Sequence, residues 1–233
     1  MRKFLLIILI IAFSIPLFGH IQAGETGVSL KNFNQTLPET QIMRLRSADL
    51  LGEIIYLPED GFNIKEAQAI VTRLDKLPSP ILAKINQAGI QVHLFEGKLT
   101  DQPTATHLKG VIPRGYSSKK TWDEVPGVGG SKTVLVKIGA SEKGNGHGSI
   151  NLELHELAHS IDRYVYDEMR SNPVFLDIWN QEKNKLFPGK SYYLSFPEEY
   201  FAETFAMYYL GESSKQLLKK KAPKTFTFFE SLS

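Results

Sequence analysis

Two histidines one helical turn apart, with a glutamate directly after the first, are the residues of this chain best suited to chemistry. His155 and His159 enclose Glu156 in the run His-Glu-Leu-Ala-His. Residues at positions i and i+4 share one face of a helix, so both imidazoles can reach one metal ion, at about 2.0–2.1 Å each for zinc. The glutamate then lies where its carboxylate can take a proton from water. The pattern predicts a zinc hydrolase.

The surrounding residues favour a helix for this motif. Apolar residues recur with helical period on one side of it, namely Leu154, Leu157, Ala158, Ile161 and Val165. A second face carries Leu152, the two histidines, Asp162 and Tyr166. The alternative is a pair of core histidines without a metal, and both rings would then need hydrogen-bond partners.

A third ligand is expected from a second helix. The sequence has no cysteine, so the ligand must be His, Asp or Glu. Ser195 and Glu198 fit a capping box and Gly211 fits a C-terminal cap, which predicts a helix between them. Glu199 and Glu203 lie one turn apart on it, so one could complete the metal site and the other could orient a ligating imidazole. Either order is open, and both could instead be surface charges.

Together the two helical motifs resemble the anthrax lethal factor-like metallopeptidase domain, and especially the secreted Pro-Pro endopeptidases of that family. The resemblance extends over roughly residues 45–233. It implies an α+β, zincin-like fold in which a small sheet with flanking helices is followed by a helical C-terminal subdomain. That subdomain would carry the third zinc ligand.

The resemblance also implies roles for particular residues. By position, the ligands of one zinc ion per chain would be His155, His159 and Glu199, and Glu156 would be the general base. A tyrosine seven residues before the glutamate ligand matches Tyr192, whose hydroxyl would support the oxyanion. Tyr193 is the adjacent competitor for that role.

A substrate-covering loop is implied between residues 113 and 130. The Lys-Gly-Trp pattern of the family corresponds to Arg114-Gly-Tyr116 in this chain, and the acid paired with it corresponds to Glu198. All three residues are therefore expected to bind substrate. Tyrosine in place of tryptophan is a departure, which leaves the shape of the groove and the preferred flanking residues open.

The amino terminus predicts secretion. Two basic residues precede a long apolar run that is broken at Pro16, so residues 1–23 are expected to be a signal peptide, and an uncleaved membrane anchor is the alternative. Residues 24–45 are polar and mixed and are expected to form a loose arm. Residues 46–233 are expected to be the metallopeptidase domain, extracellular and without stable membrane association after cleavage.

The composition limits the classes of partner that this chain is expected to bind. The formal net charge is +2, and removal of Arg2 and Lys3 with the signal peptide brings it to 0, which argues against nucleic-acid binding. The basic cluster 219–224 is interpreted as a solvated helix end. The expected partner is a proline-rich protein or peptide substrate, and the chain is expected to be a monomer that needs no disulfide.

Further elements follow from the sequence pattern. Helices are predicted over 65–74 and 80–89, and strands over 90–95 and 132–138. His93 is expected to be exposed or packed rather than to bind a metal. His147, which lies between glycines, is expected to shape a turn.

The sequence thus predicts a secreted zinc metalloendopeptidase, and the resemblance directs it at Pro-Pro bonds in proline-rich linkers of bacterial surface proteins. Two alternatives remain. A lethal factor-like module without catalysis would serve only for binding, and a zinc protease or toxin could act on another target.

Overall fold

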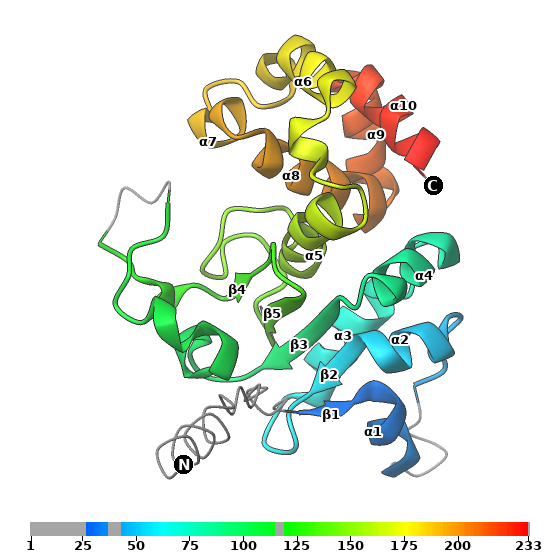
Figure 1. The fold of residues 1–233 in the computed structure, drawn as a ribbon, viewed down its shortest axis with the longest axis vertical. Helices are drawn as coiled ribbons and strands as arrows, with labels where there is room; N and C mark the ends of the chain where they lie inside the picture. Colours follow the sequence, from blue (N-terminus) through cyan, green and yellow to red (C-terminus); the bar gives the residue numbers. More distant parts are fainter. Residues whose placement is uncertain (1–26, 37–42, 115–118, 233) are drawn as a thin grey trace, which may run out of the picture.

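A five-stranded mixed sheet forms the lower half of the molecule in Figure 1. The computed structural model describes residues 27–36, 43–114 and 119–232. The strand order is β1-β2-β3-β5-β4, with β2, β3 and β5 parallel and the two outer strands antiparallel to their neighbours. The strands are β1 (Val28–Ser29), β2 (Ile55–Leu57), β3 (Gln91–Phe95), β4 (Gly127–Val128) and β5 (Thr133–Lys137).

Helices surround this sheet and continue beyond it as a helical second half. In the half that contains the sheet, the helices are α1 (Leu30–Thr36), α2 (Ala48–Ile54), α3 (Ile64–Leu74), α4 (Ser79–Gln87) and α5 (Leu152–Tyr164). The helices of the second half are α6 (Pro173–Leu186), α7 (Ser191–Ser195), α8 (Pro197–Leu210), α9 (Glu212–Lys221) and α10 (Pro223–Leu232). Short 3₁₀ turns are η3 (Leu99–Asp101), η4 (Pro103–Leu108), η5 (Trp122–Glu124) and η6 (Met169–Ser171).

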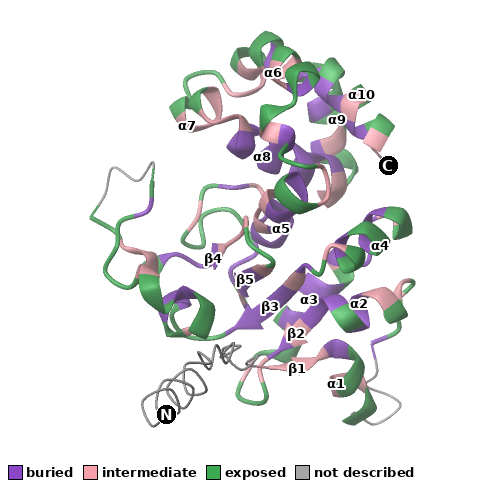
Figure 2. Ribbon diagram, viewed as in Figure 1, coloured by how far each residue is buried: buried purple, intermediate pink, exposed green. Residues whose placement is uncertain are grey.

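Helix α5 joins the two halves. It contacts β4 and β5 on one side and α8 on the other. Helix α8 is buried along almost its whole length, from Glu198 to Tyr208, as Figure 2 shows by its purple ribbon. Apolar residues lie on every side of α8 between its glutamates, which accounts for this central place. One hydrophobic core therefore runs from the sheet through α5 into the helical half.

The predicted elements of the central region are confirmed with small shifts of their ends. The helices expected over 65–74 and 80–89 are α3 and α4, and the strands expected over 90–95 and 132–138 are β3 and β5. Strands β3 and β5 pair in parallel, from Gln91 opposite Thr133 to Phe95 opposite Lys137. The signal peptide 1–23 lies outside the described residues. No helix among those described has the length and apolarity needed to cross a membrane.

Two expectations are wrong, and a third, the loop over 113–130, is only refined. The loose arm is contradicted at residues 28–36, because β1 pairs with β2 and Leu30 at the start of α1 is fully buried. The capping box of α8 is absent, because Ser195 ends α7 and the N-cap residue of α8 is Phe196. The loop expected over 113–130 contains η5 and the edge strand β4. Each error has one cause, since contacts with distant parts of the chain decided the local structure.

Candidate active site

Helix α5 sets the two histidines side by side. The Asn151 side chain caps the helix by accepting a hydrogen bond from the Leu154 amide at 3.0 Å, so the first turn is well defined. In the apolar stripe predicted from the sequence, Leu154, Leu157, Ala158 and Ile161 are buried and Val165 is partly buried, which fixes the rotation of the helix and points the imidazoles at α8. The ring centroids of His155 and His159 are 4.9 Å apart and their Nε2 atoms 3.3 Å apart.

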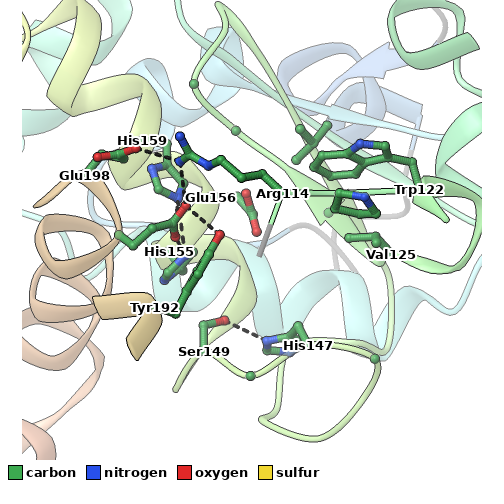
Figure 3. Close-up of a pocket in the computed structure, with 18 of the residues that line it drawn as sticks. Arg114, Trp122, Val125, His147, Ser149, His155, Glu156, His159, Tyr192 and Glu198 are labelled. Atoms are coloured by element: carbon green, nitrogen blue, oxygen red, sulfur yellow. Dashed lines mark hydrogen bonds and ion pairs between the residues drawn. The ribbon is translucent and has the colours of Figure 1, made fainter. Parts of the chain in front are cut away.

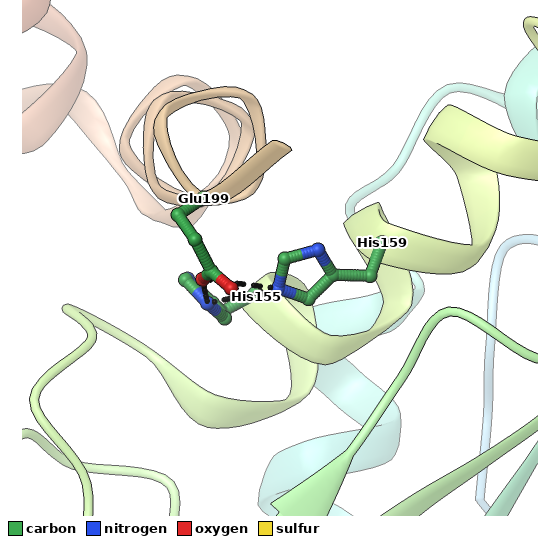
Figure 4. A group of neighbouring side chains, drawn as sticks. All are labelled: His155, His159 and Glu199. Carbon is green, nitrogen blue, oxygen red and sulfur yellow. Dashed lines mark hydrogen bonds and ion pairs between the residues drawn. The ribbon is translucent and has the colours of Figure 1, made fainter. Parts of the chain in front are cut away.

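Glu199 on α8 completes a group of three ligand atoms. Its Oε2 lies 3.3 Å from the Nε2 atom of each histidine, and all three atoms lie within 4.8 Å of one another. Figure 4 shows the two rings and the carboxylate converging on one point from two helices. Two imidazole nitrogens and one carboxylate oxygen are a donor set that zinc takes in catalytic sites, with one position left open.

The electrostatics of this group favour a positive charge at its centre. Burial lowers the pKa of His155, but hydrogen bonds to Glu199 and Glu203 outweigh burial and raise the pKa to about 10. Burial raises the pKa of Glu199, but hydrogen bonds to His155 and His159 hold that pKa far below its usual range. Two lone pairs and a carboxylate that face one another need a cation or protons between them, and the residues present therefore fit a bound metal ion.

Glu203 holds His155 from the side away from this centre. Its Oε2 lies 3.1 Å from the His155 Nδ1 atom, and its Oε1 accepts a hydrogen bond from the Ile150 amide at 3.0 Å. With Nδ1 donating to a carboxylate, the lone pair of Nε2 is directed to the centre. Of the two open assignments, this geometry favours Glu199 as the ligand and Glu203 as the group that orients the imidazole.

The three ligand atoms lie in a cleft of about 710 Å³. Glu156, half-buried, lines it beside the histidines, and Figure 3 shows its carboxylate in the space between the histidine pair and Trp122. The outer edge of the sheet forms another wall, since residues 127–130 line the cleft and β4 is the last strand in the sheet. The cleft is large enough for several residues of an extended peptide.

Tyr192 contacts the candidate metal ligand directly. It lies on α7, and its hydroxyl donates a hydrogen bond to Glu199 Oε1 at 2.7 Å. Burial and then the charge of Glu199 raise the pKa of Tyr192 far above its usual range, so the phenol keeps its proton at neutral pH. Tyr193 also lines the cleft, and burial followed by the charge of Glu203 raises its pKa as well. Of the two tyrosines, Tyr192 is the one whose hydroxyl hydrogen-bonds to Glu199.

Arg114 and Glu198 form the expected pair across the mouth of the cleft. Arg114 Nη2 donates to Glu198 Oε1 at 2.6 Å, and it lies 3.7 Å from Glu199 Oε1. The guanidinium also lies over the ring of Phe196, 4.2 Å from its centroid. Tyr116, the third expected substrate-binding residue, lies outside the described residues. Phe196 was missed in the sequence, although its place directly before Pro197 and the paired acid could have drawn attention to it.

The other two histidines considered from the sequence are held by local contacts. His147 lines the cleft, but its ring nitrogens lie 2.6 Å from Ser149 Oγ and 2.8 Å from the Ala140 carbonyl, so it braces a turn. His93 is buried and stacks on the ring of Tyr56. Both match the interpretation drawn from the sequence.

The sequence and fold match proteins of one family. The family described as "Anthrax toxin lethal factor, N- and C-terminal domain" matches residues 41–232. A Pro-Pro endopeptidase of Paenibacillus alvei is 39% identical over 184 residues, 78% of this chain and 84% of that protein. A Pro-Pro endopeptidase of Clostridioides difficile (strain 630) is 42% identical over 189 residues, 80% of this chain and 84% of that protein.

A solved structure is also similar to this chain. The solved structure of the Pro-Pro endopeptidase (PPEP-2) from Paenibacillus alvei superimposes with a TM-score of 0.75 at 39% sequence identity. The match covers 79% of this chain and 100% of that chain. The family match thus includes both α5 and α8, the helices that bring the candidate ligands together.

Proposed function

The chain belongs to the anthrax toxin lethal factor family, and on that premise we propose that it is a zinc metalloendopeptidase that hydrolyses the bond between two prolines. One observation carries the proposal. His155, His159 and Glu199 converge within 4.8 Å of one another in a cleft that Glu156 also lines. Such a group beside a free carboxylate suits hydrolysis rather than binding alone.

The roles of the residues follow from their positions. A zinc ion held by His155, His159 and Glu199 would supply a Lewis acid that polarises the substrate carbonyl and makes a water molecule acidic. The Glu156 carboxylate accepts the proton of the attacking water and passes it to the leaving proline nitrogen as the C–N bond breaks. The Tyr192 hydroxyl, which donates to Glu199 Oε1 in this structure, would turn its proton to the carbonyl oxygen as negative charge develops there.

A Pro-Pro bond places unusual demands on this cleft. Proline has no backbone N–H and its φ is fixed, so a run of prolines favours the extended polyproline II form. Such a substrate can make few backbone hydrogen bonds to the outer edge of β4, and flat apolar contacts must replace them. The cleft offers aromatic rings for this purpose in Trp122, Tyr192 and Tyr193. Arg114, Tyr116 and Glu198 are the residues we assign to holding the peptide at the mouth.

The proposal extends to the setting of the enzyme. The fold around the site would be zincin-like, with one zinc ion per chain held between the sheet-bearing half and the helical half. Cleavage after Ala23 would release a secreted, monomeric protein, with residues 46–233 as its peptidase domain. Proline-rich linkers of bacterial surface proteins are substrates that such an enzyme would meet outside the cell.

One experiment tests the activity and its specificity together. Purified protein is analysed for bound metal and then incubated with a peptide library that contains every type of bond, beside Glu156→Ala as the inactive reference. We expect one zinc ion per chain and cleavage between two prolines only. Efficient cleavage at other bonds alone would contradict the Pro-Pro assignment. Equal cleavage by Glu156→Ala would contradict the role of the carboxylate.

A further inference from the structure

The segment 127–131 lies against α5 so closely that Gly129 admits no side chain and Gly127 leaves little room for one. A Cβ added at Gly129 would lie 1.9 Å from the carbonyl oxygen of Glu156 and 2.7 Å from its carbonyl carbon. A Cβ added at Gly127 would lie 3.1 Å from Glu156 Cγ and 3.0 Å from Leu152 Cδ1. The segment therefore rests on the very turn of α5 that carries the proposed proton acceptor.

Hydrogen bonds hold the same segment on the next turn of the helix. Ser160 is fully buried, and its hydroxyl accepts from the Gly130 amide at 3.0 Å and donates to the Ser131 carbonyl at 2.7 Å. Arg163 Nη1 donates to the Gly130 carbonyl at 3.2 Å. Glu156 and Ser160 are four residues apart, so one stripe of α5 makes these contacts while the neighbouring stripe carries the histidines.

The contact between segment 127–131 and α5 connects two parts of the cleft, the edge of β4 and Glu156. On one side of the segment, β4 offers its outer edge to the space that a peptide would occupy. On the other side lies the backbone of Glu156 itself. A displacement of about 1 Å between a substrate and the group that receives its proton can lower a rate by about 100-fold. A constant distance between the edge of β4 and the Glu156 carboxylate therefore favours catalysis.

We propose that Gly127, Gly129 and Ser160 are positioning residues, which clamp the edge segment 127–131 onto the Glu156 turn of α5 so that a bound peptide and the proton acceptor keep one spacing. The inference rests on the proposed function. It adds that Gly129 and Ser160 act through Glu156 and β4 and need no contact with substrate or metal, while Gly127 is part of β4 itself.

Single substitutions test the clamp from both sides. Gly129→Ala must push the segment away from α5, because the added carbon meets backbone rather than a movable side chain. Ser160→Ala removes both hydrogen bonds without adding bulk. The matched controls are Gly211→Ala, where an added Cβ meets nothing within 4 Å, and Ser214→Ala, whose hydroxyl donates to the Gly211 carbonyl far from the cleft.

Three quantities are measured for each variant: kcat and KM on a Pro-Pro peptide, affinity for zinc, and hydrogen exchange of the backbone amides. We expect Gly129→Ala to lower kcat about 100-fold, with KM and zinc affinity changed less than about threefold. We expect Ser160→Ala to speed exchange of the Gly130 amide by about tenfold or more and to lower kcat, with exchange in α8 unchanged. Both controls should behave as the wild type.

The outcomes distinguish a failure of the proposed function from a failure of the proposed clamp. If wild-type protein cleaves no Pro-Pro peptide, the proposed function fails. If wild type and Gly211→Ala are active and Gly129→Ala is equally active, the clamp is overturned. Should Gly129→Ala not fold, Ser160→Ala decides: faster exchange of the Gly130 amide with unchanged kcat shows that the released segment does not affect catalysis, and the inference is wrong.

Discussion

Replacing Glu203 by glutamine isolates the contribution of one buried carboxylate to metal binding. Glu203 is only 4% exposed, and its two oxygens accept hydrogen bonds from His155 Nδ1 and from the Ile150 amide. Glutamine has the same size but only one acceptor oxygen. One of the two buried donors must therefore face an NH₂ group and lose its acceptor.

The magnitude follows from that loss. A buried donor left without an acceptor costs about 1–3 kcal/mol. Loss of a carboxylate that orients a ligating imidazole typically lowers metal affinity about 10–100-fold, or about 1.4–2.8 kcal/mol. The two ranges overlap, so we expect Glu203→Gln to weaken zinc binding about 10–100-fold while His155, His159 and Glu199 remain in place.

Competition with a fluorescent chelator measures the zinc affinity, and thermal unfolding of the metal-free protein measures stability. Glu182→Gln is the matched control. Glu182 is 2% exposed and accepts hydrogen bonds from the backbone amides of Lys224 and Thr225, but it touches no histidine. It should lose stability and keep its zinc affinity. Wild-type zinc affinity in Glu203→Gln would refute the reasoning.

Three further predictions concern the cleft and its loop. Tyr192→Phe should lower kcat about 100-fold at saturating zinc, because it removes one donor to the oxyanion, and the excess zinc offsets the loss of its hydrogen bond to Glu199; an unchanged kcat in steady-state kinetics would exclude that role. Arg114→Ala should raise KM for a Pro-Pro peptide. It should change the free energy of unfolding by less than about 1 kcal/mol, because the ion pair between Arg114 and Glu198 is partly exposed. A large loss of stability would mean that this ion pair is structural. Hydrogen bonds, first of all from the Gly110 amide, lower the pKa of Asp123 to about 2 from its usual 3.8. Because the folded pKa is the lower one, this carboxylate stabilises the fold fully above about pH 4 and loses its effect as the pH falls toward 2. Thermal unfolding of Asp123→Asn should therefore lie below that of wild type at neutral pH and approach it near pH 2, and a constant difference across this range would contradict the assignment.

The metal-bearing helix could be predicted from the sequence because its signals are local. The apolar stripe of α5 repeats with the helical period, and the two histidines fall on the adjacent face. The carboxylates of α8 could be placed only as alternatives. Their roles depend on where α8 crosses α5, and no local pattern states which of Glu199 and Glu203 comes nearer the rings.

The errors have the same physical origin. β4 consists of Gly127 and Val128 within a segment rich in glycine and proline, which alone indicates a loop. Its extended form depends on pairing with β5 and on contact with α5. Ser195 and Glu198 match a capping box, yet Ser195 ends α7 and Glu198 pairs with Arg114, which lies far away in the sequence.

Helix α8 links the stability of the fold to the chemistry of the site. Glu199 and Glu203 lie on a helix that is buried on all sides, where an unpaired carboxylate would be very costly, whereas Glu198 lies at the mouth of the cleft beside a partly exposed guanidinium. Each carboxylate finds its partner outside α8, on Arg114 or on the histidine face of α5. A bound metal would raise the free energy of unfolding further, by about 2.7 kcal/mol at a free metal concentration one hundred times its dissociation constant, because its ligands come from both α5 and α8. Loss of activity in a Glu199 variant therefore has two possible causes, a missing ligand and a loosened contact between α5 and α8. Only a comparison of unfolding in the metal-free proteins separates them.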